Sequence, residues 1–202
     1  MSQLLPLFPL ELVLFPGMPL PLHIFEERYN EIIGELLEEK RPFGVVRATK
    51  KGVAEIGCSA EILAVTKRHE DGRLDIVTEG RERFEVMHLE QGRSFLQGEV
   101  QFFDDEPGVT PKDQVERVLE LHRDAMTLLE AGGQLPTGEE PQLSFLLAGV
   151  LPFDLDFKQT LLGIRSEPER VIGLIEYYQA IMPDLRRAVK ARRKSGGNGH
   201  VS

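Results

Sequence analysis

Residues 4–29 read LLPLFPLELVLFPGMPLPLHIFEERY, an apolar stretch that five prolines interrupt. Because proline removes a backbone donor, strands in this stretch are expected to be short, edge-like or interrupted. The pattern predicts extended segments at residues 4–8, 11–15 and 20–23, with a turn at Pro16-Gly17. The chain is therefore expected to begin its fold with strands rather than with a long helix.

After this stretch the periodicity changes twice. Apolar residues at helical spacing from Phe25 to Leu36 predict one amphipathic helix. From residue 43 to residue 103 the period becomes two, which predicts several strands. Turns are expected at 69–72, which contains Asp-Gly, and at 79–81. Strands joined by tight turns favour an antiparallel sheet that is curled into a small barrel.

Beyond residue 106 the pattern is helical. Helices are expected from near Pro111, at 143–150, at 154–163 and from Ser166, where Ser166 and Glu169 match a capping box. Pro183 is expected to kink or restart the last helix. The predicted fold class is α+β, with a β-rich subdomain (residues 1–106), a C-terminal α-helical bundle (107–190) and a basic flexible tail (191–202).

Charge and composition exclude several classes of protein. The 202 residues carry a net charge of -9, but residues 186–202 hold six cations and no acid, which leaves -15 on residues 1–185. Such an acidic body argues against nucleic acid as a partner. The single cysteine, Cys58, excludes an internal disulfide framework and is expected to be a small packed residue. Without a long apolar run or a secretory signal, a cytoplasmic location is expected and a membrane is not.

No sequence pattern typical of catalysis is present. There is no P-loop, no nucleophile elbow and no pair of histidines at metal-ligand spacing, so catalytic residues, metal ligands and cofactors are all predicted to be none. Paired carboxylates such as Glu38 and Glu39 are expected to be solvated. His122 is expected to be a core histidine, and His23 either to fix a strand-to-helix turn or to line a groove.

Several motifs in one order resemble a known family. They are Leu5-Pro6-Leu7-Phe8-Pro9-Leu10, Leu14-Phe15-Pro16-Gly17, residues 20–29, Phe43-Gly44-Val45-Val46, Asp71-Gly72-Arg73, Gly80-x-x-Arg83-Phe84 and Leu151-Pro152-Phe153. From Leu4 to Arg187 the chain resembles the N-terminal domain of Lon proteases, especially its stand-alone bacterial version. The resemblance implies a PUA-like β-barrel followed by a helical bundle, which in the protease binds exposed hydrophobic or unfolded polypeptide. The catalytic motifs of that family lie in other domains, so no catalytic residue is carried over.

The resemblance implies a non-catalytic binding module, with unfolded polypeptide or another protein as partner and a role in protein quality control. A rigid apolar groove is hypothesised at Phe8, Phe15, Pro16, His23, Phe25, Arg28 and Tyr29. The aromatic residues among them can equally be core, and Arg28 can equally pair with a nearby glutamate. Two other functions stay open: an RNA-binding PUA-like protein, and a small-molecule binder or enzyme with a pocket between the subdomains.

Overall fold

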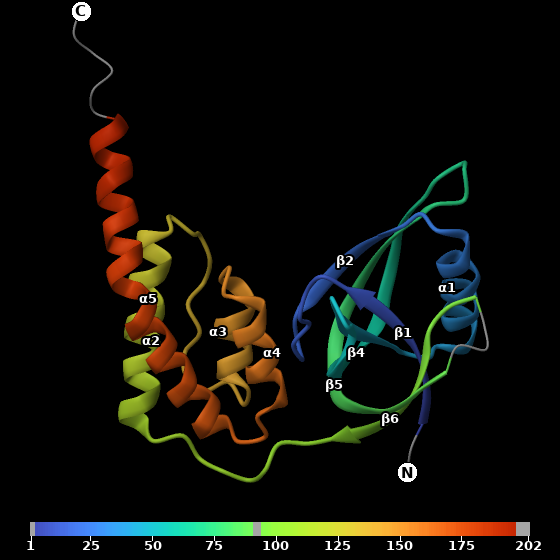
Figure 1. Cartoon of the computed structure of the whole chain (residues 1–202), viewed down its shortest axis with the longest axis horizontal. Coiled ribbons are helices and arrows are strands. Elements are labelled where there is room, and N and C mark those ends of the chain that lie inside the picture. Colours follow the sequence, from blue (N-terminus) through green and yellow to red (C-terminus); the bar gives the residue numbers. More distant parts are fainter. Residues whose placement is uncertain (1–2, 91–93, 197–202) are drawn as a thin grey trace, which may run out of the picture. The chain divides into compact units, whose positions relative to one another are not determined.

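The computed structural model describes residues 3–90 and 94–196, apart from the side chains of Glu27, Arg28, Glu31 and residues 193–196. The chain divides into two compact units. The first comprises Met1–Asp105 and Pro152–Gly163, and the second comprises Glu106–Leu151 and Ile164–Ser202. The β-rich unit therefore includes one short helix from the C-terminal half of the sequence. Figure 1 labels the elements in chain order.

Strands dominate the described part of the first unit. Its elements are β1 (Gln3–Leu10), β2 (Pro19–Ile24), α1 (Glu27–Glu39), β3 (Phe43–Thr49), β4 (Gly52–Arg68), β5 (Leu74–Glu90), β6 (Gln97–Phe103) and α4 (Leu155–Gly163). The expected helix after Phe25 and the expected strands at 20–23, 43–47 and 58–68 are confirmed. Residues 11–15 form no strand and lead instead into the turn before β2.

The strands form one sheet in the order β2-β5-β4-β3-β1-β6, and β6 also pairs with β5. Hydrogen-bonded pairing therefore returns to β5 after passing through β4, β3, β1 and β6. The pairs are antiparallel except β1–β3, which is parallel, with Leu7 opposite Gly44. An all-antiparallel sheet was expected from the tight turns. The connection from β1 to β3 includes β2 and α1, and only such a long crossover lets two strands run in the same direction.

The two expected turns have different outcomes. The turn at 69–72 is confirmed: the His69 N–H donates to Arg73 O at 2.9 Å, and Gly72 has a φ of 89°. The prediction of a turn at 79–81 is wrong, because β5 continues through these residues. The Gly80 N–H donates to Met18 O at 2.9 Å, and a Cβ at Gly80 would lie 2.2 Å from Phe15 O. Glycine at this position allows a neighbouring backbone to approach closely rather than the chain to turn.

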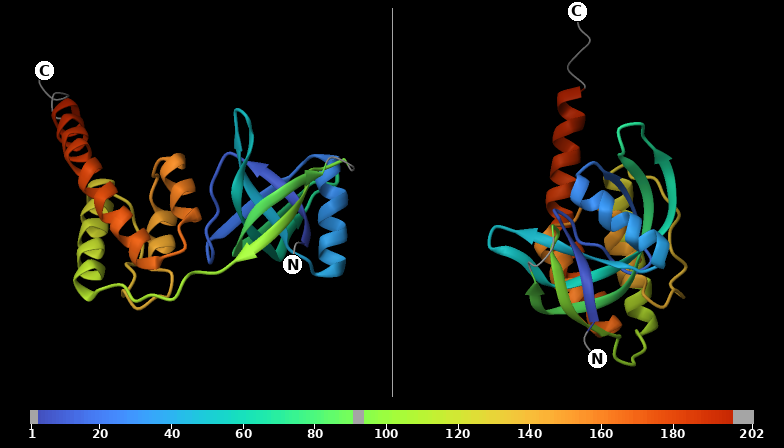
Figure 2. Two further views of the ribbon diagram at one scale, coloured as in Figure 1. Left: turned by 60° about the horizontal axis from the view of Figure 1, so that its bottom comes forward. Right: turned by 90° about the vertical axis from the view of Figure 1, so that its right-hand side faces the viewer.

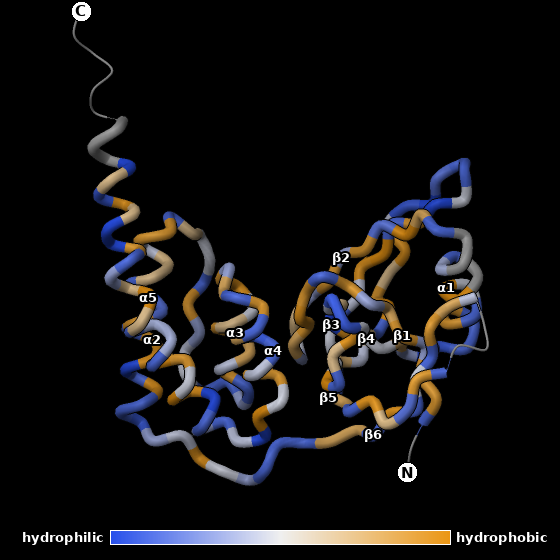
Figure 3. The backbone as a smooth tube through the Cα atoms, in the orientation of Figure 1, coloured by the Kyte–Doolittle hydropathy of each residue, from blue (hydrophilic) through white to orange (hydrophobic). Residues whose placement is uncertain are grey.

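The main core of the first unit lies between the sheet and α1. Ile32, Ile33 and Leu36 of α1 pack into a cluster with Phe8 and Phe43 from the strands. The helix lies along one side of the sheet in the views of Figure 2. Figure 3 shows hydrophilic residues at the β4–β5 hairpin, whereas hydropathy alternates along β2. The hairpin therefore faces solvent, and β2 directs Leu20 and Ile24 into the core.

The second unit is helical where it is described. Helix α2 (Lys112–Leu128) and α3 (Leu143–Val150) each pack against α5 (Glu167–Gly196). His122 is confirmed as a core histidine: it is 1% exposed, and its Nδ1 lies 2.6 Å from the Tyr178 hydroxyl. Burial lowers the pKa of His122 to about 4. Pro183 lies inside α5, which continues past it without a restart.

Among the described residues, none of the helices combines the length and the apolar character needed to cross a lipid bilayer.

Candidate polypeptide-binding surface

Three of the residues hypothesised to line a groove lie in the interior. Phe8 is 3% exposed, Phe15 is 1% exposed and Pro16 is buried. The Phe8 ring stacks against Tyr29, which is half-buried, and tilts against Phe43, with ring centroids 4.5 Å apart in both pairs. Phe8, Phe15 and Pro16 therefore belong to the interior and do not line an exposed groove.

His23 and Phe25 are the members of the hypothesised set whose side chains reach the surface. Phe25 is 66% exposed, and its ring lies 6.2 Å from that of His23, nearly parallel to it. The side chain of Arg28 lies outside the described residues. The structure therefore brings one exposed aromatic ring and one exposed imidazole together at the end of β2.

His23 has a specific partner on the neighbouring strand. It lies directly opposite Asp75 in the β2–β5 pairing, and its Nδ1 is 2.5 Å from Asp75 Oδ1. His69, in the β4–β5 hairpin, places Nε2 2.9 Å from Asp75 Oδ2. The hydrogen bonds from His23 and then His69 hold the pKa of Asp75 below its usual value. Sequence spacing missed this cluster because strand pairing, not helical periodicity, brings its members together.

A second surface feature lies on β4 and β5 at the end opposite to their hairpin. The start of β4 and the end of β5 form an open groove of about 410 Å³, lined by Val53, Ala54, Glu55, Val86, Met87, His88 and Leu89. Met87 is 56% exposed and Leu89 is 39% exposed, whereas Val53 and Val86 pack on a core cluster. One sequence signal could have identified it: Val86, Met87 and Leu89 place apolar side chains on both faces of one strand.

The free edge of β2 is poorly suited to adding another strand. Among the described strands β2 pairs with β5 alone. Because the Gly80 N–H bonds to Met18 O, the ladder directs the backbone groups of Leu20 and Leu22 toward β5. Pro19 and Pro21 then occupy the outward-directed positions, where proline offers no N–H. A polypeptide that binds near β2 would have to be held by side chains.

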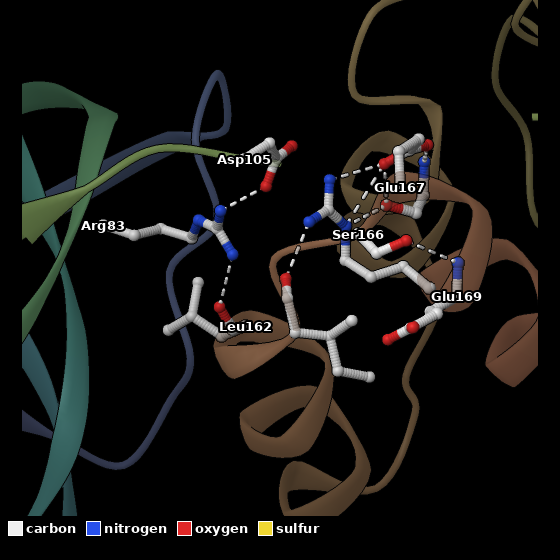
Figure 4. Close-up of polar contacts among 9 residues, drawn as sticks. Arg83, Asp105, Leu162, Ser166, Glu167 and Glu169 are labelled. Atoms are coloured by element: carbon white, nitrogen blue, oxygen red, sulfur yellow. Dashed lines mark hydrogen bonds and ion pairs between the residues drawn. The ribbon is translucent and has the colours of Figure 1, made fainter. Parts of the chain in front are cut away.

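Each unit also contains a buried arginine to which the sequence analysis assigned no role. Arg83 of β5, 2% exposed, donates to Leu162 O at 2.9 Å and pairs with Asp105 (Figure 4). Arg170 of α5 is fully buried and donates to Glu167 Oε2 at 2.6 Å. Each guanidinium group is buried and has polar partners in its own unit, which favours a structural role for both arginines.

The expected cap of the last helix is present beside Arg170. The Glu169 N–H donates to the Ser166 hydroxyl oxygen at 3.4 Å, a contact drawn in Figure 4. Cys58, also expected to be packed, is fully buried, and its burial raises the pKa of the thiol to about 12. A thiol with such a pKa stays protonated and unreactive at neutral pH.

Comparison with proteins of known sequence identifies Lon proteases among the relatives of this chain. The chain is 24% identical to a Lon protease of Cytophaga hutchinsonii over 193 residues, covering 86% of this chain and 24% of that protein. It is 28% identical to a Lon protease of Paraburkholderia phytofirmans over 202 residues, covering 92% of this chain and 25% of that protein. The chain therefore spans about a quarter of the length of these relatives.

Solved structures agree with this relationship. A Lon N-terminal domain protein from Xanthomonas campestris superposes with a TM-score of 0.72 at 25% identity, covering 87% of this chain and 98% of that one. The N-terminal domain of a Mycobacterium avium complex Lon protease superposes with a TM-score of 0.62 at 15% identity, covering 88% and 98%, and shows the shared fold. The family described as the ATP-dependent protease La (LON) substrate-binding domain matches residues 4–179. The chain, with its mixed sheet and helical segment, belongs to the Lon substrate-binding domain family.

Proposed function

We propose that this chain is a non-catalytic module that binds extended, apolar segments of unfolded polypeptides. The observation that carries the proposal is the match of residues 4–179 to a family described as a substrate-binding domain. The closed circuit of strand pairing supports assigning the first unit to the PUA-like barrels, and the packing of α2 and α3 on α5 supports describing the second as a helical bundle.

The groove formed by the start of β4 and the end of β5 is the surface that we assign to the polypeptide. Met87 and Leu89 offer exposed apolar area over a floor of Val53 and Val86, so an apolar side chain would gain burial without displacing the core. Glu55, at the lining of the groove, has a carboxylate that can accept hydrogen bonds from the backbone N–H groups of an extended chain. An unstructured apolar segment satisfies both requirements, because its side chains and its backbone donors are exposed together.

His23 and Phe25 would form a second contact at the end of β2, whereas Phe8, Phe15 and Pro16 are buried and Tyr29 is half-buried. The exposed Phe25 ring provides apolar area, and the prolines of β2 would leave binding to side chains there. Arg28 remains part of this proposed contact by its place in the sequence. We further propose a cytoplasmic role in protein quality control, a β-rich part at residues 1–106, a helical part at 107–190 and a basic tail at 191–202.

The proposal is tested with a reduced, alkylated protein that cannot refold, labelled with a fluorophore and titrated with the full chain. We expect saturable binding by fluorescence anisotropy, weakened at least 10-fold by the double substitution Met87→Glu and Leu89→Glu. Leu63→Glu is the matched control, because Leu63 is 49% exposed on β4 but does not line the groove.

Three outcomes would contradict the proposal. They are no binding by the unaltered chain, an equal loss in the Leu63→Glu control, and preferential binding of a single-stranded RNA in the same assay. The last would favour the RNA-binding alternative, which the acidic residues 1–185 disfavour.

A further inference from the structure

His23, His69 and Asp75 meet on the outer face of the first unit, away from its core. In the β2–β5 pairing, the inward positions are Leu20 and Ile24 of β2 and Leu74 and Ile76 of β5, all of which are buried. The alternation of a strand therefore directs the opposed pair His23 and Asp75 outward. His69 reaches the same carboxylate from the hairpin that joins β4 to β5.

We propose that these three side chains form a binding site for Zn²⁺ or a divalent metal ion of similar preference. One ligand atom from each residue, a histidine nitrogen or a carboxylate oxygen, lies within 4.8 Å of the other two. Zinc bonds of about 2.0–2.2 Å place tetrahedral ligands roughly 3.3 Å apart. Asp75 contacts His23 through Oδ1 (2.5 Å) and His69 through Oδ2 (2.9 Å). To admit the ion, the carboxylate would turn to offer one oxygen, and the ligand atoms, now within 4.8 Å of one another, would adjust to about the 3.3 Å spacing.

The side chains have the freedom that this rearrangement requires. His23 is 45% exposed, Asp75 34% and His69 20%, so each can adjust its torsions without disturbing the core. The strands fix the backbones of His23 and Asp75, since Asp75 pairs with β2 on one side and with Lys67 of β4 on the other. The backbone of His69 is held by its N–H, which donates to Arg73 O at 2.9 Å. A rigid frame with adjustable donors lowers the ordering cost of capturing an ion.

The donor set selects the class of metal. Two imidazole nitrogens and one carboxylate suit Zn²⁺, Ni²⁺ or Cu²⁺, whereas Mg²⁺ and Ca²⁺ prefer sites made only of oxygen. Three protein ligands leave a position that water can fill, as in open zinc sites. The ion would bridge β2 to the β4–β5 hairpin, beside the exposed ring of Phe25.

Arg73 brings a positive charge close to the proposed site, in addition to Lys67, which lies opposite Asp75 in the β4–β5 pairing. Arg73 Nη1 lies 3.5 Å from His23 Nε2, while Arg73 Nη2 is paired with Asp71 at 2.8 Å. When His23 Nδ1 binds a metal, its proton moves to Nε2, and the Arg73 guanidinium must then swing away. Arg73 is exposed and already held by Asp71, so this movement buries no charge. Replacing Arg73 with glutamine is expected to tighten metal binding about two- to five-fold, because it removes a nearby positive charge.

Isothermal titration of the full, untagged chain with zinc chloride tests the site. We expect one ion per chain and at least a 10-fold loss of affinity in each of His23→Ala, His69→Ala and Asp75→Asn. His88→Ala is the matched control, since His88 is an exposed histidine on β5 outside the cluster. Circular dichroism verifies that each variant is folded, which keeps a loss of binding attributable to the ligands.

A second measurement separates a true site from loose surface binding. Co²⁺ at the same site should give visible absorption bands of a histidine-ligated ion, abolished in Asp75→Asn and retained in His88→Ala. Absence of zinc binding by the unaltered chain would overturn the proposal. Zinc affinities of Asp75→Asn and His69→Ala that equal the affinity of the unaltered chain would overturn it as well. These outcomes are independent of polypeptide binding, which is measured at the groove with Met87→Glu and Leu89→Glu.

Discussion

The two buried arginines show how differently the two units are held together. Arg83 of the first unit bonds to Leu162 and Asp105, which are 79 and 22 residues away in the sequence. Arg170 of the second unit bonds to Glu167, three residues earlier on the same helix. Arg83 therefore joins segments of the first unit that are far apart in the sequence. Arg170 instead pairs with a residue one turn away on its own helix, and this pair contacts a neighbouring helix.

The local pair in the second unit also organises a neighbouring helix. Glu167 accepts the Ser144 N–H at 2.8 Å and the Ser144 hydroxyl at 2.7 Å, at the start of α3, which has no side-chain cap of its own. Arg170 donates to the Ser144 hydroxyl at 2.8 Å and to Ile164 O at 2.7 Å, and it lies 4.2 Å from the centre of the Phe145 ring. A carboxylate from α5 thus caps α3, and the arginine neutralises that carboxylate.

Arg170→Met is expected to have the largest effect on stability. It removes the cation from Glu167, whose side chain is only 14% exposed, and breaking a largely buried pair in this way costs about 3–5 kcal/mol. The free energy of unfolding in urea measures the loss. Arg117→Met is the control: Arg117 pairs with Glu120 at the same i,i+3 spacing but is exposed, so its loss should cost at most about 1 kcal/mol. Equal losses in the two variants would contradict the role assigned to burial.

Arg83→Met is expected to lower the free energy of unfolding by about 3 kcal/mol, somewhat less than Arg170→Met does. Its partner Asp105 is 22% exposed, so water can partly solvate the carboxylate that loses its cation. Arg81→Met, an exposed arginine on the same strand, should cost at most about 1 kcal/mol. Amide hydrogen exchange should show faster exchange in β5 and α4 for Arg83→Met. Faster exchange in α3 and α5 instead would remove the distinction between the two units.

Glycine substitutions compare the units at the level of the backbone. Gly80→Ala in β5 would place a Cβ 2.2 Å from Phe15 O, so we expect a loss of about 2–3 kcal/mol. Gly173→Ala in α5 meets nothing within 4 Å and should stabilise the helix by about 0.5–1 kcal/mol. Urea unfolding of both variants gives the two values. A neutral Gly80→Ala would show that the turn before β2 can move away.

His122 extends the comparison from a buried charge to a buried neutral group. Its pKa is about 4 in the folded protein and 6.5 in the unfolded chain. Between pH 4 and pH 6.5 the unfolded chain therefore binds more protons than the folded protein does. Stability is therefore unaffected above pH 6.5 and falls as the pH decreases toward 4, by about 2 kcal/mol between pH 7 and pH 5. His122→Gln should reduce this pH dependence by that amount, measured as urea unfolding at both pH values. An unchanged pH dependence would show that His122 can be protonated inside the fold.

Much of the secondary structure was predictable from local pattern, as were the Ser166 cap of the last helix and the burial of His122. Alternation predicted β2 and β3, the Asp-Gly pair predicted the β4–β5 hairpin, and Ser166 and Glu169 predicted the cap of the last helix. Helical spacing placed His122 in the core, as observed. Each of these features depends on residues within a few positions of one another, which is the range over which sequence pattern carries information.

The candidate site was predicted less completely. His23 and Phe25 do reach the surface, but Phe8 and Phe15 have the same aromatic character and are buried, so residue type alone could not separate them. Met87 and Leu89 were missed because exposure of an apolar strand face depends on what packs over it. Gly80 was misread as a turn, since a glycine needed for close approach looks the same in sequence as one needed for positive φ.

The sequence by itself determined the acidic charge, the order of strands and helices, and the motifs that the Lon substrate-binding domain family shares. Only the tertiary structure decided that β1 runs parallel to β3, that α4 joins the β-rich unit and that Asp75 lies between two histidines. It also decided which arginines would be buried. The physical reason is the same in each case: these features are contacts between residues far apart in the chain, and their energy exists only once the sheet and the helices have packed.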